Sequence, residues 1–80
     1  MKPDLDMSQY GVIRRALRHE RRRRKLSIAN LADRLGVGDA TMAGWELGRH
    51  SPSPTDLCRW AASLDMIVVL TEGDLLPGRP

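Results

Sequence analysis

The fold of this 80-residue chain is decided by the stretch Ser27-Ile-Ala-Asn-Leu-Ala-Asp-Arg-Leu-Gly-Val-Gly-Asp-Ala-Thr-Met-Ala-Gly-Trp-Glu-Leu-Gly48. Ser27 can cap a helix over about 28–35, in which apolar residues recur at helical spacing. Gly36 follows at the position where a left-handed C-terminal cap favours glycine. A second helix then spans about 38–47, and a further glycine ends it. Two short helices joined by a glycine turn predict a helix-turn-helix unit.

Helical signals continue on both sides of this unit. Apolar spacing predicts a helix over about 9–24, and Ser53-Pro54 opens another helix that extends to about Leu64. The loop at 49–52 has room for one more helical turn. Residues 66–71, Met-Ile-Val-Val-Leu-Thr, have the composition of a strand. We therefore predict an all-α fold, a compact four- to five-helix bundle with a helix-turn-helix, plus a short C-terminal β-strand.

The length allows one domain, which we expect to span 9–65. An N-terminal arm (1–8) would precede it, and a dimerisation strand (66–71) and a tail (72–80) would follow. The lone cysteine, Cys58, excludes an internal disulfide and a multi-cysteine metal site, and we expect it to be at least half buried.

Other classes of function find no support in the residue pattern. No serine–histidine–carboxylate set or carboxylate pair stands out, so we expect no enzyme, no metal site, no cofactor and no small-molecule ligand. The longest apolar run is too short for a membrane helix, and the first residues lack the apolar core of a signal peptide. We expect a cytoplasmic protein, prokaryotic or phage-encoded and associated with the nucleoid.

The positive charge is concentrated in one segment. Residues 14–25 contain eight basic side chains and one acidic side chain, a formal charge of +7, whereas the whole chain carries +3. On the helix expected there, Arg14, Arg18, Arg22 and Lys25 follow one flank. A dense cationic helix suits a phosphate backbone, because neutralising phosphates releases condensed counterions. A solvated helix face is the competing interpretation.

From Leu17 to Leu64 the chain resembles the lambda-repressor-like, or Cro-type (XRE family), helix-turn-helix domain. The matching stretches are Leu-Ser at 26–27, Leu-Ala at 31–32, Leu-Gly-Val at 35–37, Thr-Met at 41–42, Trp-Glu at 45–46, Gly-Arg at 48–49, Ser-Pro at 51–52 and Leu at 57. The resemblance implies that Arg21 and Glu46 form a structural ion pair. It also implies that the second helix of the unit lies in the major groove of DNA.

The resemblance assigns the DNA-binding positions. Base edges would be read from Gly38, Asp39, Ala40, Thr41 and Gly44, and phosphates would be held by Ser27, Arg49, His50 and Ser51. None of the reading positions carries an arginine, lysine, asparagine or glutamine. Lys25 stands where the family usually has a glycine in a left-handed turn. We therefore expect DNA shape to contribute much of the discrimination.

The expected strand has no convincing partner within the chain. An unpaired strand leaves its hydrogen-bonding edge open, so we expect it to pair with the same segment of a second copy. The dimer interface would comprise Met66, Ile67, Val68, Val69 and Leu70. Packing within the subunit beside 5–7 is the alternative. A two-fold dimer would match a palindromic operator in double-stranded DNA.

These observations favour a sequence-specific DNA-binding transcriptional regulator, a dimeric repressor that acts by occupying its operator. The alternative is a protein-interaction module, antitoxin- or adaptor-like, that keeps the helix-turn-helix scaffold with weak or non-specific DNA binding. The small side chains on the expected reading helix favour that alternative.

Overall fold

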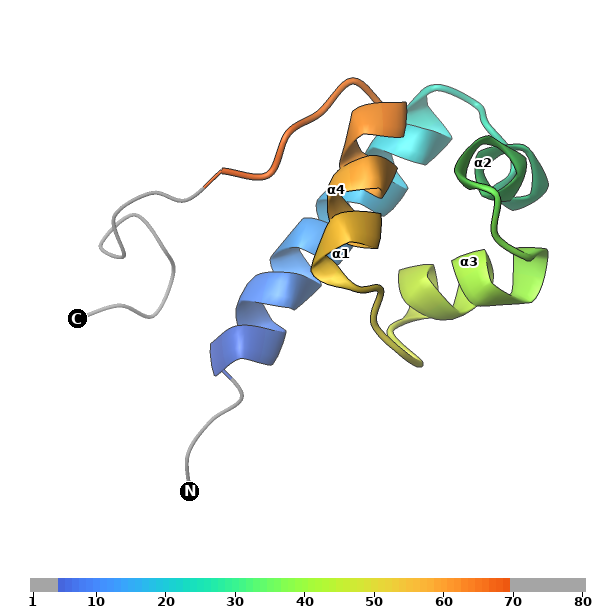
Figure 1. Cartoon of the computed structure of the whole chain (residues 1–80). Helices are drawn as coiled ribbons and strands as arrows, with labels where there is room; N and C mark the ends of the chain where they lie inside the picture. Colours follow the sequence, from blue (N-terminus) through green and yellow to red (C-terminus); the bar gives the residue numbers. More distant parts are fainter. Residues whose placement is uncertain (1–4, 70–80) are drawn as a thin grey trace.

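The structure, a computed structural model, describes residues 5–69 of the chain and contains four helices in that range (Figure 1). They are α1 (Leu5–Arg23), α2 (Ile28–Leu35), α3 (Asp39–Leu47) and α4 (Pro54–Ser63). The all-α bundle with a helix-turn-helix is therefore confirmed, and the loop at 49–52 adds no further helix. Helix α1 begins four residues earlier than the apolar spacing indicated, so residues 5–8 are helical. None of the described helices is long and apolar enough to cross a membrane.

The helix ends follow the capping residues. The Ser27 Oγ accepts a hydrogen bond from the amide of Asn30 at 3.0 Å, and the Ser53 Oγ accepts one from the amide of Asp56 at 3.1 Å. Each bond satisfies an amide that the first helical turn leaves without a partner. Gly36 and Gly48, which follow α2 and α3, have φ angles of 70° and 76°. Glycine adopts this left-handed conformation without steric cost, so both helices end where the sequence predicts.

The turn between α1 and α2 uses a left-handed residue that is not glycine. Lys25 has a φ of 59°, and its amide donates to the carbonyl of Arg22 at 3.0 Å. A side chain in this region costs about 1–2 kcal/mol because the Cβ atom approaches a carbonyl oxygen. The turn is therefore closed at an energetic cost that a glycine would avoid.

The core lies where α2, α3 and α4 meet α1. Helix α2 packs on α3 and α4, and α1 packs on α3. The buried apolar side chains are Leu17, Leu31, Ala32, Leu35, Met42, Trp45, Trp60, Ala61 and Leu64. The rings of Trp45 and Trp60 lie against each other with centroids 5.9 Å apart. Ala32 is fully buried and small, which lets α2 and α3 cross closely.

A buried carboxylate joins α3 to α1. Glu46 is only 1% exposed, and its two carboxylate oxygens accept hydrogen bonds from Nε and Nη2 of Arg21 at 2.6 and 3.0 Å. The structure thus brings together the two side chains that the resemblance paired. Arg21 also donates to the carbonyl of Leu26 at 2.7 Å, which ties the α1–α2 turn to the same guanidinium.

Two further arginines of α1 face the same glutamate. Arg14 donates to the backbone carbonyl of Glu46 at 2.9 Å, and the Arg18 Nε lies 4.0 Å from the carboxylate. Arg14, Arg18 and Arg21 recur every three or four residues, so they form one stripe along α1. Helix α3 is therefore held to α1 through both the side chain and the backbone of a single residue.

Arginines also fix α4 to its neighbours. Arg24 pairs with Asp65, just past α4, at 2.9 Å. Arg59 of α4 donates to the carbonyl of Leu35 at 2.6 Å, and Arg34 of α2 donates to that of Ser63 at 3.3 Å. The last two bonds use carbonyl groups at helix ends, which have no acceptor role within their own helices.

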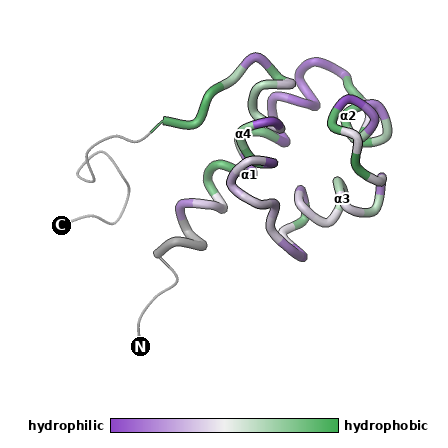
Figure 2. Tube along the Cα trace, in the orientation of Figure 1, coloured by the Kyte–Doolittle hydropathy of each residue, from purple (hydrophilic) through white to green (hydrophobic). Residues whose placement is uncertain are grey.

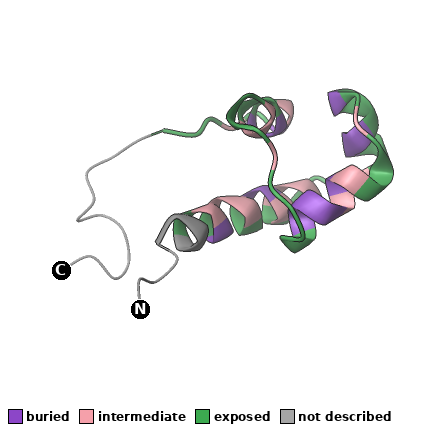
Figure 3. Ribbon diagram, turned by 60° about the horizontal axis from the view of Figure 1, so that its bottom comes forward, coloured by how far each residue is buried: buried purple, intermediate pink, exposed green. Residues whose placement is uncertain are grey.

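The C-terminal strand is not shown. Met66–Val69 form no strand, and Leu70 and Thr71 lie outside the described residues. Figure 2 shows this segment as an apolar run that leaves the end of α4, and Figure 3 shows it as largely exposed. Ile67 is 81% exposed and Val69 is 62% exposed. A strand needs a neighbour to satisfy its backbone groups, and the described part of one chain supplies none here.

Replacing Lys25 by glycine should stabilise the protein. We expect Lys25→Gly to gain about 0.5–1 kcal/mol in free energy of unfolding, because relief of the left-handed strain exceeds the added entropy of the unfolded chain. Lys25→Ala is the matched control, because it removes the same charge but keeps Cβ. Urea denaturation measures both variants, and equal stability of the two would contradict the strain argument.

Removing Arg21 should be far more costly than removing Arg18. We expect Arg21→Ala to lose about 3–5 kcal/mol in urea denaturation, because it leaves the buried Glu46 carboxylate without its partner. Arg18→Ala is the control from the same helix, since that side chain is 41% exposed and lies 4.0 Å from the carboxylate. A similar loss of stability in both variants would show that the bidentate Arg21–Glu46 pair stabilises the fold no more than Arg18 does.

Candidate nucleic-acid interface

Helix α3 has one buried face and one outward face. Met42, Trp45 and Glu46 are buried against the core. Ala40, Gly44 and Leu47 recur at intervals of four and three residues, so they share the opposite face. Ala40 is exposed and Leu47 is 50% exposed. The outward face of α3, defined by Ala40, Gly44 and Leu47, is therefore directed away from the core.

The first turn of α3 offers further contacts beside this face. Gly38, Asp39 and Ala40 are exposed, and Thr41 is half-buried. Gly38 occupies the N-cap position without a side-chain cap, so unpaired amides remain at the start of α3. The Asp39 carboxylate lies in this first turn, where a negative charge interacts favourably with the helix dipole. Asp39 thus has a stabilising role in addition to any contact with a base.

Gly44 is not open to a ligand. It is buried although it belongs to the outward face, because the imidazole of His50 covers it. A Cβ atom built on Gly44 would lie 2.1 Å from Cε1 of His50 and 2.7 Å from its Nε2. The ring therefore covers the backbone at which the resemblance placed a contact with a base edge. Sequence patterns missed this approach because it depends on the path of the loop after Gly48.

The candidate phosphate-binding side chains lie just before α2 and in the loop after α3. Ser27 is exposed, and because its oxygen accepts the Asn30 amide, its hydroxyl hydrogen is free to donate to a phosphate. Arg49 and Ser51 are exposed in the loop that follows α3. The amide of Arg49 donates to the carbonyl of Gly44 at 2.9 Å, which fixes the backbone from which its side chain extends.

The cationic flank of α1 is divided by the structure. Arg14 and Arg18 face Glu46, whereas Arg22 and Lys25 make no ion pair with another described residue. Arg23 and Arg24 bind Glu20, each within 2.6 Å, and these hydrogen bonds lower the pKa of that carboxyl to about 2. Within residues 5–69, five exposed lysine and arginine side chains make no ion pair: Arg15, Arg22, Lys25, Arg34 and Arg49.

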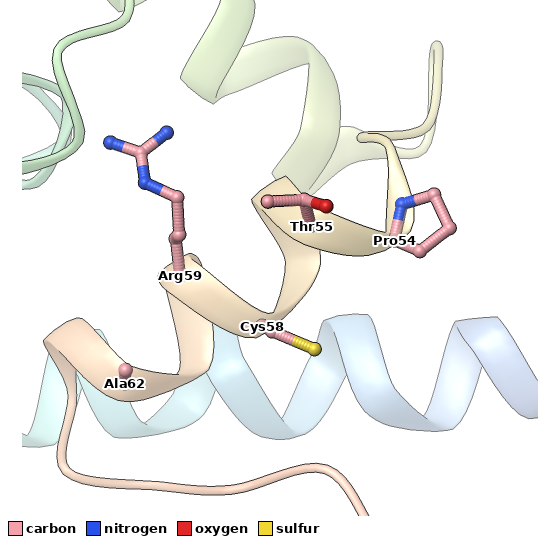
Figure 4. A pocket seen from close by; sticks show the side chains of 5 residues that line it. All are labelled: Pro54, Thr55, Cys58, Arg59 and Ala62. Carbon is pink, nitrogen blue, oxygen red and sulfur yellow. The ribbon is translucent and has the colours of Figure 1, made fainter.

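The structure offers little elsewhere for a small ligand. A shallow hollow on α4 is lined by Pro54, Thr55, Cys58, Arg59 and Ala62 (Figure 4). Cys58 is exposed there, so its expected burial is wrong. No three histidine, cysteine or acidic side chains within the described range are grouped so that they could hold a metal ion.

The comparisons with known proteins agree with this geometry. The model of a family described as a helix-turn-helix domain matches residues 13–68, which include all of α2, α3 and α4 and most of α1. No curated protein and no solved structure gives a significant match. The matched range covers the stretches that carry the resemblance to the Cro-type domain. The chain therefore belongs to the helix-turn-helix domain family.

Proposed function

We propose that this protein is a sequence-specific, double-stranded DNA-binding transcriptional regulator that represses by occupying its operator. The observation that carries the proposal is the presentation of α3. Its outward face is directed away from the core, while the Arg21–Glu46 pair and the Arg14 bond hold its other face to α1. A rigid helix held in this way can enter the major groove without a change in the fold.

The charge distribution supports a polyanionic partner. The exposed cations without an ion pair include Lys25, just before α2, and Arg49, just after α3. Each phosphate that such a side chain neutralises releases counterions and makes binding dependent on salt. The amides at the start of α3 add donors for a phosphate or a base edge. The protein would act in the cytoplasm of a prokaryote, on the nucleoid, and without catalysis of its own.

A homodimer is part of this proposal. The apolar run at 66–69 includes Ile67, Val68 and Val69, and all three of these side chains are exposed. Pairing with the same segment of a second copy would bury these side chains and satisfy the backbone groups of both. A two-fold arrangement would place two α3 helices about 34 Å apart on a palindromic operator, one turn of DNA.

One observation favours a second candidate, a protein-interaction module. Leu47 is 50% exposed and shares its face with Ala40, so this part of α3 is apolar and small. A surface of this kind also suits a protein partner. In that case the helix-turn-helix would serve as a scaffold, and binding to DNA would not depend on its sequence.

The DNA proposal is tested by binding to the DNA upstream of the protein's own gene and to a scrambled duplex over a range of salt concentrations. We expect a specificity ratio well above one at each salt concentration. A ratio near one throughout would favour the interaction module, whatever the total affinity.

Two variants locate the contacts in the same assay. Arg49→Ala should weaken binding to all duplexes alike and reduce the salt slope by about 0.9, the value for one phosphate contact. Asp39→Ala should change the base preference instead, because Asp39 lies in the first turn of α3. The reverse pattern would show that these two residues have been assigned to the wrong contacts.

Dimerisation is tested by adding a charge to the C-terminal segment. We expect Val69→Asp to sediment as a monomer, because a buried carboxylate would oppose pairing of the segments. Val12→Asp is the matched control, because Val12 is an exposed apolar residue on α1. Monomers from the control but not from Val69→Asp would place the interface on α1.

A further inference from the structure

The imidazole of His50 lies on the outward face of α3. Gly44 is at the middle of that face, one helical turn from Ala40 and three residues before Leu47. The three ring atoms nearest to a Cβ built on Gly44 are Cε1, Nε2 and Nδ1, at 2.1, 2.7 and 2.9 Å. The ring thus occupies the space into which a side chain at position 44 would project.

This arrangement supplies the outward face of α3 with a polar group that the residues of that face lack. Position 44 carries no side chain, and the neighbouring Ala40 and Leu47 have no hydrogen-bonding groups. His50 remains exposed in the loop, and its ring makes no hydrogen bond or ion pair to another described residue. Its donor and acceptor are therefore available to a ligand that approaches α3.

We propose that His50 reads a base in the major groove, in place of a side chain at position 44. This inference rests on the proposed function and names the determinant of its specificity. In the major groove, guanine presents two acceptors, N7 and O6, and adenine presents only N7 next to a donor. An imidazole N–H on the outward face of α3 suits guanine best. This role differs from the phosphate contact that the position after α3 suggests.

The test compares the base preferences of variants in a pool of duplexes with randomised half-sites. Wild-type protein should prefer guanine at one position of each half-site. His50→Ala should lose about fivefold of that preference, the equivalent of one hydrogen bond, and should keep the preferences at other positions. Arg49→Ala provides the comparison, because loss of a phosphate contact lowers the affinity for every duplex alike.

Gly44→Ala provides a second variant that retains the histidine. The added Cβ cannot coexist with the ring at 2.1 Å, so the imidazole must leave the face. The same guanine preference should then be lost, while thermal stability stays equal or rises, because alanine favours a helix interior more than glycine does. Measuring both base preference and thermal stability of Gly44→Ala separates displacement of the His50 ring from loss of the fold.

Two results would overturn the inference without affecting the proposed function. Wild-type specificity that persists unchanged in His50→Ala would show that the ring reads no base. If His50→Ala instead weakens binding to all duplexes alike and reduces the salt slope, His50 contacts a phosphate. A wild-type protein that prefers no sequence would instead reject the proposed function and, with it, this inference.

Discussion

The position of α3 depends on one buried carboxylate. Glu46 is almost fully removed from water, and a charge in that environment is tolerable only when it is paired and fully hydrogen-bonded. Arg21 meets this requirement with two bonds and uses a third to hold the turn that leads into α2. The same guanidinium therefore fixes both the start of the helix-turn-helix and its second helix. The contacts of α1 therefore set the orientation in which α3 meets any partner.

Local signals predicted most of the fold. Ser27 and Ser53 cap the helices that follow them, and Gly36 and Gly48 end α2 and α3, because caps and left-handed glycines act within a few residues of their own position. The early start of α1 was missed because residues 5–8 carry no apolar repeat that points to a core. The expected strand at 66–71 was inferred from composition alone, and a strand also requires a neighbour that composition cannot supply.

The candidate interface was less predictable, because it depends on contacts between distant residues. The resemblance paired Arg21 with Glu46, whereas nothing in the spacing showed that Arg14 would bond the backbone of the same residue. Charge counting treated residues 14–25 as one cationic strip, but Glu20 and Glu46 engage five of its eight basic side chains. Which arginines remain available is decided by the tertiary structure. The helical spacing of Arg14, Arg18 and Arg21 was the one sequence signal that could have indicated their shared stripe.

The position of His50 over Gly44 separates two selective pressures that a helix normally combines. A side chain on α3 must suit both the helical backbone and its binding partner, whereas a loop side chain that rests on a glycine has only the second requirement. Substitutions at position 50 can therefore alter the surface of α3 without changing helix propensity or core packing. Related chains with the same glycine would be free to diversify their targets through a single codon, at little risk to folding.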